Sequence, residues 1–415
     1  MNILIIGAGG REHAIASTLA KNEKVNNIFL SKHNGGSQGK IINAEINHDD
    51  FEVVENFIKE NNVELTIVGP EAPLDNGIVD YLEKGNHKVF GPKKSSAILE
   101  GSKKFAKDFM KKYGINTAKY SHYDTYEQAL ASINDFGYPT VIKANGLCQG
   151  KGVYICEDEK QAKNALEEIF LDNIFKDQGG SVVIEQYLKG FEASLLCFVS
   201  GNKIYPFDTA MDYKKIYEGD LGPNTGGVGA ISPNPLWKEV HQAQSNQILA
   251  KIEEGLKNEN MSFSGILFIG YLIQNDEVFV LEFNTRFGDP ETEVLLPRLK
   301  SDLLENIEQS INYEEVKLDF EDNVAMATIL VSKGYPKSYQ KGYEITGLDD
   351  LEDIIVYHNG TKKLNQKILS DGGRVLSIVS LSDSLDSSRK SVYDAIEKIH
   401  FENMSYRKDI GKLEN

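Results

Sequence analysis

The residues with the clearest chemical potential lie near the end of one expected strand. The apolar run 278–281 predicts a strand, and Asp289-Pro290 stops it. Side chains alternate along a strand, so Glu282 and Asn284 project from one face, and Arg286 follows on that face if the strand continues. Two hard oxygen ligands suit Mg²⁺, and a guanidinium suits phosphate oxygens. The spacing predicts a site for a metal ion and a nucleoside triphosphate; an edge strand with a solvated polar face is the structural alternative.

A second candidate site lies at the start of the chain, where a strand, a glycine turn and a helix follow one another. Residues 2–6 predict the strand, Gly9 and Gly10 lie in the turn, and Arg11 and Glu12 open the helix. A dinucleotide fingerprint would need a third glycine where His13 stands and an acidic residue after the second strand. Both departures disfavour NAD and a Rossmann oxidoreductase. The turn predicts a sugar-phosphate site, with a glycine turn made only for tight packing as the alternative.

Other strand ends in the first hundred residues carry similar turns. Gly69, Pro70 and Glu71 follow the expected strand 65–68, and another strand ends near residue 90. Ligands bind at the carboxyl ends of strands in open parallel sheets, so Glu71 is a candidate for ribose hydroxyls. The alternation of strands and helices predicts a doubly wound parallel α/β sheet.

The middle of the chain offers lysines and a glycine-rich hairpin. The lysine cluster around Lys103 opens a helix and reads most simply as a solvated face, although one lysine could bind phosphate. Lys143 ends a strand, and Gly150-Lys151-Gly152 leads into the next strand. This is not a Walker A loop, which needs Gly-Lys-Ser/Thr opening a helix. We expect a lid over phosphates, with an ordinary bulged hairpin as the alternative.

Composition limits the function classes. The chain has 415 residues, enough for two to four domains, and a formal net charge of −17. That charge argues against a nucleic-acid or anionic-membrane surface. The three cysteines show neither metal-ligand spacing nor a disulfide framework, and no apolar run is long enough to span a bilayer. We expect a cytoplasmic protein that binds no nucleic acid and no membrane.

Taken in order along the chain, these motifs resemble the ATP-grasp superfamily of carboxylate–amine ligases. Within it the chain resembles the phosphoribosylamine–glycine ligase family, almost from end to end. The most specific motifs are residues 5–13, 68–74, 222–227 and 286–291. The resemblance implies an N-terminal doubly wound domain at 1–101, an ATP-grasp core at 102–322 with a mobile lid at about 120–190, and a small α+β domain at 323–415.

The resemblance also implies an activity and a set of site residues. ATP, with Mg²⁺ or Mn²⁺, would ligate glycine to 5-phosphoribosylamine through a glycyl phosphate; a monomer is expected, with a homodimer as the alternative. The implied metal ligands are Glu282 and Asn284, and the implied catalytic residues are Arg286, Asp289 and Lys214. ATP would contact Lys103, Lys143, Gly150, Lys151, Gly152, Glu185, Tyr187, Leu188 and Glu192. The substrates would contact Gly9, Gly10, Arg11, Glu12, Gly69, Pro70, Glu71, Asp212, Asn224 and Thr225.

The chain departs from the family pattern in a few places. The family usually has Asp-His-Lys-Arg where this chain has Asp212-Tyr213-Lys214-Lys215, which puts a proton-transfer role at Tyr213 in doubt. Glu293 stands where glutamine is common, so an amide contact there is not assumed. Residues 208–231 predict a long polar loop, and Arg374 reads as a surface residue.

Two alternatives to the ligase remain open on the sequence. A related ATP-grasp carboxylase, acting on a nucleotide amine or biotin, would share the ATP site and use bicarbonate. A non-catalytic nucleotide sensor would share the fold and bind ATP without turnover. The local motifs carry the substrate assignment, because one fold serves many ligases.

Overall fold

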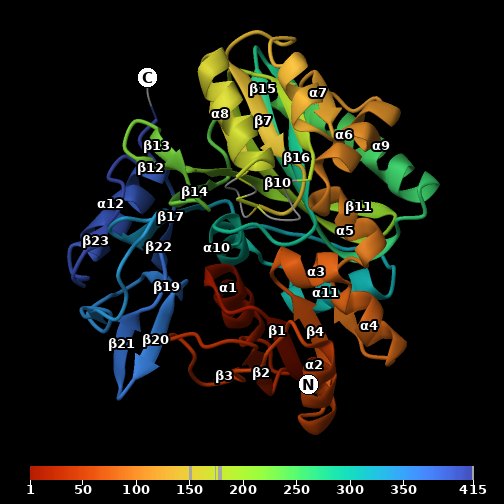
Figure 1. The fold of residues 1–415 in the computed structure, drawn as a ribbon. Helices are drawn as coiled ribbons and strands as arrows, with labels where there is room; N and C mark the ends of the chain where they lie inside the picture. Colours follow the sequence, from red (N-terminus) through yellow and green to blue (C-terminus); the bar gives the residue numbers. More distant parts are fainter. Residues whose placement is uncertain (149–151, 173, 176–179, 414–415) are drawn as a thin grey trace.

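The computed structural model describes residues 1–148, 152–172, 174–175 and 180–413, and Figure 1 shows their arrangement. The expected α/β class is confirmed: an N-terminal parallel sheet, a central α/β part and a small C-terminal part. The predicted lysine-tipped hairpin Gly150-Lys151 lies outside the described residues.

The N-terminal part is a five-stranded parallel sheet of order β3-β2-β1-β4-β5. Its strands are β1 (Asn2–Ile6), β2 (Asn27–Leu30), β3 (Ile41–Asn43), β4 (Val63–Val68) and β5 (Val89–Phe90). Its helices are α1 (Gly10–Leu19), α2 (Phe51–Glu60), α3 (Glu71–Asn76) and α4 (Ile78–Lys84). The strand order reverses between β1 and β4, so the turns after these two strands meet at a topological switch point.

The central and C-terminal parts share one nine-stranded sheet of order β16-β15-β10-β11-β14-β17-β22-β19, with β23 paired to β17. The strands from the central part are β10 (Phe191–Gly201), β11 (Lys203–Asp212), β14 (Gly229–Ser232), β15 (Phe263–Gln274) and β16 (Glu277–Asn284). The C-terminal strands are β17 (Val324–Ser332), β19 (Ile355–His358), β22 (Arg374–Ser382) and β23 (Met404–Ser405). Since β14 pairs with β17, a continuous ladder of hydrogen bonds joins the two parts.

Helices and small sheets complete these two parts. The helices are α5 (Lys94–Gly101), α6 (Lys103–Lys112), α9 (Glu239–Asn258), α10 (Glu291–Leu295), the 3₁₀ turn η2 (Leu296–Arg298), α11 (Leu303–Ile311) and α12 (Leu385–Ile396). A three-stranded sheet holds β18 (Glu344–Ile345), β20 (Thr361–Leu364) and β21 (Lys367–Ser370). The prediction of one long loop at 208–231 is wrong, because β12 (Lys215–Tyr217) and β13 (Leu221–Asn224) form a hairpin there. These two strands are short and contain glycine and polar residues, so their sequence shows no period-two alternation of apolar and polar side chains.

A separate four-stranded sheet, of order β6-β9-β7-β8, lies at the top of Figure 1. Its elements are β6 (Tyr120–Tyr123), α7 (Tyr126–Ala131), β7 (Thr140–Ala144), β8 (Val153–Cys156), α8 (Glu159–Phe170) and β9 (Val182–Gln186). The antiparallel pairing of β7 with β8 confirms the expected hairpin around the glycine loop. These elements bury an apolar cluster of their own, which makes this sheet and its helices a distinct packing unit.

The fully buried helix α10 lies where the three parts meet, next to α1, β14 and β22 (Figure 1). The N-terminal and C-terminal parts also contact each other directly, since Gly35 N donates to Thr361 O at 3.1 Å. Among the described residues, no helix combines the length and apolarity needed to cross a membrane.

Four phenylalanines tie β5 of the N-terminal part to the large sheet. Phe198 stacks on Phe207 with ring centroids 5.3 Å apart, and Phe90 lies 5.6 Å from Phe198. Phe287, just beyond β16, lies 6.3 Å from both Phe90 and Phe207. This aromatic cluster supports the turn that follows the expected metal strand.

We predict that Phe207→Ala lowers the free energy of unfolding by about 3–5 kcal/mol. Removal of the ring leaves a cavity, because the surrounding side chains are held in place by two sheets and cannot fill it. Urea unfolding followed by circular dichroism measures the change. Val240→Ala, at an exposed position of α9, is the control and should change stability by less than about 0.5 kcal/mol. Equal midpoints for the two variants would contradict the assigned role of the cluster.

Candidate active site

A β-bulge aims the expected metal ligands at the end of β16. Gly270 pairs with Glu282, whereas the next residue of β15, Tyr271, pairs with Val280, so Leu281 is an extra residue in β16. Leu281 packs against the buried cluster of Ala118, Leu188 and Leu272, and Leu272 lies on the same face of β15 as Gly270. The bulge therefore places an apolar side chain beside the Glu282 carboxylate, which strict alternation does not predict.

Four cationic side chains from four segments surround that carboxylate. They are Lys103, Lys143, Lys214 and Arg286. Burial opposes the charge of Glu282, but the attraction of these cations outweighs burial and holds its pKa below the usual range. Arg286 Nη2 also donates to Asn284 Oδ1 at 3.4 Å, so the structure brings Glu282 and Asn284 together beside the predicted cation.

This charge pattern fits a polyphosphate and a divalent cation. Four cations act on one carboxylate, while Glu282 and Asn284 contribute oxygen ligands. No group of three or more histidine, cysteine, aspartate or glutamate side chains in the described residues is arranged to hold a metal ion. A Mg²⁺ ion that is bound together with substrate phosphates typically has only a few protein ligands.

Both oxygens of the Glu185 carboxylate, from a residue predicted among the ATP contacts, are paired with lysines. Its Oε1 lies 2.9 Å from Lys143 Nζ, and its Oε2 lies 3.0 Å from Lys107 Nζ. Lys107 is only 2% exposed and also donates to Thr117 Oγ1 at 2.7 Å. Burial lowers the pKa of Lys107 to about 8, against the attraction of Glu185. Glu185 therefore fixes the position of Lys143. The interpretation of the lysine cluster around Lys103 as a solvated face is wrong for Lys107, which is buried.

Sequence reasoning missed Lys107, although a signal was present. Lys107 follows Lys103 by four residues, so the two share one face of α6. Lys103 Nζ donates to Gly146 O at 2.7 Å and lies near Glu282, whereas Lys104 Nζ lies 3.6 Å from Asp124. Lys103 is thus the lysine that faces the site.

An apolar patch adjoins the cations. Leu188, just after β9, is buried with Ala118 and Leu272, and Phe279 and Leu281 pack against them. Tyr187 is half-buried next to this patch, and Gly152 is buried beside Cys148 at the start of β8. A flat apolar ring could pack here with a phosphate tail directed toward the lysines.

The segment after β11 brings more charge to the site. Lys214 Nζ lies 2.7 Å from Glu192 Oε2, and Thr225 donates through both its N and its Oγ1 to Lys214 O at 2.8 Å. Burial raises the pKa of Asp212 to about 8, with Lys214 opposing the shift and nearby carboxylates adding to it. Asn224 ends β13 opposite Lys215 in the hairpin ladder. The predicted residues of this segment, Asp212, Lys214, Asn224 and Thr225, therefore lie together, and Glu192 is paired with Lys214.

Arg286 is bracketed by acids from two helices. Its Nη2 lies 3.1 Å from Glu100 Oε1, and its Nε lies 3.9 Å from Glu71 Oε2. Glu100, at the end of α5, also accepts from Thr285 N at 2.7 Å. Burial raises the pKa of Glu100, while Arg286 opposes the shift. No sequence pattern singles out Glu100, because its role depends on a contact across 186 positions.

The glycine turn after β1 is already occupied by an anion of the chain itself. Gly9 N donates to Glu12 Oε2 at 2.6 Å, and Arg11 Nε donates to Glu12 Oε1 at 2.6 Å. Gly69 lacks a side chain where a Cβ would overlap Glu12. Glu12 therefore already accepts one backbone N–H at the turn predicted to bind a substrate phosphate, and Arg11 Nη1 donates to Phe287 O at 3.1 Å.

Arg374 is not the surface residue that the sequence suggests. Its Nη1 lies 2.8 Å from Asp289 Oδ1 and donates to Gly226 O, which links β22 to the segments that carry these two residues. Burial and then the charge of Asp289 raise the pKa of Glu293 well above its usual range, which favours the neutral form of this side chain. A neutral acid can donate a hydrogen bond, as the glutamine common at this position in the family can.

Three models of one protein family match most of the chain. Residues 1–100, 101–292 and 325–413 match the family models described as phosphoribosylglycinamide synthetase N domain, ATP-grasp (A) domain and C domain.

The chain is 44% identical over 99% of both chains to phosphoribosylamine–glycine ligase of Caldanaerobacter subterraneus subsp. tengcongensis. It is 45% identical over 99% of its length to the protein of that name from Clostridium acetobutylicum, which it covers fully. The solved phosphoribosylamine–glycine ligase of Thermotoga maritima matches with a TM-score of 0.88 and 31% identity, over 99% of this chain and 100% of that one. A biotin carboxylase from Campylobacter jejuni matches with a TM-score of 0.75 and 14% identity, over 99% and 94%, which shows the fold alone.

We predict that Gly227→Ala lowers activity at least tenfold with a smaller effect on global unfolding. Gly227 has φ +103°, and an added Cβ would overlap Pro290 Cδ, so the loop must move away from the turn that carries Asp289. Gly114→Ala is the matched control, since Gly114 has φ +63° and open space around it. Equal activity of both variants would show that this close approach is unimportant.

Proposed function

The chain belongs to the phosphoribosylglycinamide synthetase family, and on that premise we propose that its site joins glycine to 5-phosphoribosylamine in purine biosynthesis. ATP is consumed, and the products are glycinamide ribonucleotide, ADP and phosphate. The observation that carries the proposal is the Glu282 carboxylate, held ionised among four cations beside Asn284. Relatives that match over 99% of the chain bear the name phosphoribosylamine–glycine ligase.

The reaction needs activation, because the carboxylate of glycine is a poor electrophile. Transfer of the γ-phosphoryl group from ATP to a glycine oxygen forms glycyl phosphate and releases ADP. The amine of phosphoribosylamine then attacks the carbonyl carbon, phosphate leaves with its electron pair, and the amine loses a proton. The protein acts mainly by positioning the reactants and by stabilising charge.

In this proposal the cations bind the phosphate tail of ATP, and the oxygen ligands bind its metal ion. Lys143, held by Glu185, and Lys103 bind phosphate oxygens. Glu282 and Asn284 would hold Mg²⁺ or Mn²⁺, which would neutralise charge on the phosphate tail. The adenine ring would pack on the apolar patch at Leu188, with Tyr187 next to it.

The segment around Lys214 forms the amino-acid pocket in this proposal. Lys214 and Asp212 lie next to the metal ligand Glu282, and Asn224 and Thr225 close the same segment. Arg286 would steady the transferring phosphoryl group or the glycine carboxylate, and its fixation by Glu100 suits either role. Asp289, paired with Arg374, would orient the second substrate from the opposite side.

Phosphoribosylamine would enter from the N-terminal part, at the turns after β1 and β4. Glu71 would bind ribose hydroxyls, and the backbone of Gly10, Gly69 and Pro70 would line the approach. Glu12 orders the turn by bonding Gly9 N and Arg11, so it acts through them. The lid, residues of about 120–190, would close over the acyl phosphate and exclude water, with 1–101 and 323–415 as the flanking domains.

We predict that Glu282→Gln lowers kcat/KM by more than about 100-fold while the circular dichroism spectrum is retained, because a metal ligand stabilises the transition state by several kcal/mol. Steady-state ADP formation at saturating Mg²⁺ measures the effect. Glu277→Gln, at an exposed position of the same strand, is the control and should keep near-normal activity. Near-normal activity of Glu282→Gln would remove this residue from the metal site.

We also predict that phosphate release requires glycine and phosphoribosylamine together, because the acyl phosphate forms in a closed site and is consumed by the amine. The assay measures ADP and phosphate while each acid and amine is supplied in turn. Release that depends on bicarbonate would indicate the carboxylase alternative, and ATP binding without turnover in any mixture would indicate a sensor.

A further inference from the structure

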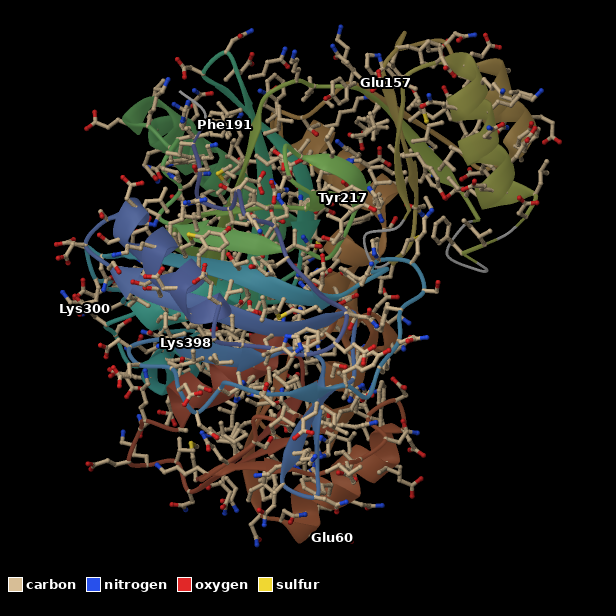
Figure 2. All side chains as sticks on the ribbon, turned by 90° about the vertical axis from the view of Figure 1, so that its left-hand side faces the viewer. Glu60, Glu157, Phe191, Tyr217, Lys300 and Lys398 are labelled. Atoms are coloured by element: carbon tan, nitrogen blue, oxygen red, sulfur yellow. The ribbon has the colours of Figure 1, made fainter. Side chains whose placement is uncertain are left out.

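The hairpin β12–β13 follows Lys214 directly but has little core of its own. It is a two-stranded sheet, which is marginally stable in water at best. Tyr217 and Leu221 are 62% and 64% exposed, and in the view of Figure 2 Tyr217 lies between Glu157 of the lid and Lys398 of the C-terminal part. Something outside the hairpin must therefore fix its position.

Arg407, next to the short strand β23 near the end of the chain, makes several contacts with this hairpin. Its Nη1 donates to Lys215 O at 2.9 Å and lies 2.7 Å from Asp220 Oδ1. Its guanidinium carbon lies 5.2 Å from the centre of the Tyr213 ring. Arg407 is itself 3% exposed, and Asp409 fixes it through two hydrogen bonds of 2.8 and 2.7 Å. A buried guanidinium held on two sides has one orientation, which suits it for fixing a loop.

The neighbours of Arg407 hold the tip of the hairpin. Asp409 Oδ2 accepts from Gly219 N at 2.8 Å, and Lys408 N donates to Glu218 Oε1 at 3.2 Å. Gly219 and Asp220 both have left-handed backbone conformations, with φ of +68° and +52°. The tight turn and the residues that follow β23 therefore determine each other's conformation.

Tyr213 links the same segment to the site. Its hydroxyl accepts from Gly411 N at 3.3 Å, and its ring lies under Arg407, so the side chain points away from Lys214 and Asp212. Ile410 is fully buried against Gly229, where an added Cβ would touch its side chain. The tyrosine that stands where the family usually has histidine therefore packs against residues 407–411.

We propose that residues 407–411, termed here the C-terminal clamp, position Lys214 in the amino-acid pocket, and that Arg407 is the central positioning residue of the clamp. The clamp acts through the hairpin and through Tyr213, and Thr225 is bound in turn to the carbonyl of Lys214. The inference rests on the proposed function, because it takes Lys214 as part of the glycine pocket. Loss of the clamp loosens this pocket and leaves the ATP-binding lysines of α6 and β7 in place.

The test compares Arg407→Met, Arg407→Lys and Asp220→Asn in the full-length chain, with Asp322→Asn as the control at an exposed carboxylate outside these contacts. Asp220 is 68% exposed at its side chain, so its substitution removes one ion pair and keeps the fold even if Arg407→Met does not fold. Two readouts are taken: amide hydrogen exchange of peptides covering 215–224, and KM for glycine and for ATP with kcat.

We expect exchange in 215–224 to become at least tenfold faster in Arg407→Met and severalfold faster in Asp220→Asn, with KM for glycine raised about tenfold and threefold. KM for ATP should stay within twofold, and Arg407→Lys should recover part of both effects because it restores the charge. Unchanged exchange and unchanged KM for glycine in Asp220→Asn and Arg407→Met would overturn the proposal. Faster exchange with an unchanged KM for glycine would also overturn it, since the clamp would then be structural only.

Lys214→Ala separates this result from a failure of the proposed function. A large rise of KM for glycine in Lys214→Ala supports the pocket assignment, whereas unchanged kinetics would refute that assignment and, with it, the substrate role of the clamp. The exchange data on Arg407→Met still show in that case whether the clamp holds the hairpin, because they do not depend on activity.

Discussion

One interaction underlies the rest of the structure: the attraction of four cations favours the charged form of the partly buried Glu282 carboxylate. Each of those cations would itself be costly to bury alone. Three are paired with further acids, Lys143 with Glu185, Lys214 with Glu192, and Arg286 with Glu100. The site is therefore a network in which acids position cations and cations keep one acid ionised. In the proposed reaction, such a network would stabilise phosphate without rearranging when charge develops.

The network spans segments that the fold must bring together from a distance. The bulge in β16 turns Glu282 and Leu281 to one face, and helix α6 delivers Lys103 and Lys107 with four-residue spacing. The nine-stranded sheet then carries the same framework into the C-terminal part, where β22 places Arg374 against Asp289. The C-terminal part thus has a role in the site, although its sequence shows no chemistry of its own.

At the N-terminal turn, the sequence motif predicts the backbone elements but not the side chain that contacts the turn. The strand, glycine turn and helix are present, and the turns after β1 and β4 meet at the switch point of the sheet. The free N–H groups at that helix start would favour an anion, and Glu12 provides one within the chain. The glycines serve the close approach of Glu12 at least as much as the approach of a ligand.

The sequence by itself determined the α/β class, the parallel strands of the first hundred residues, the hairpin β7–β8 and the in-phase placement of Glu282 and Asn284. These features depend on local patterns: apolar runs, period-two alternation and glycine turns. Only the tertiary structure decided that Lys107 is buried on Glu185, that Glu100 holds Arg286, that Glu12 fills its own turn and that Tyr213 faces Arg407. Most of these pairs join residues tens to hundreds of positions apart, and in each of them burial and charge pairing, which no local pattern encodes, set the role of the side chain.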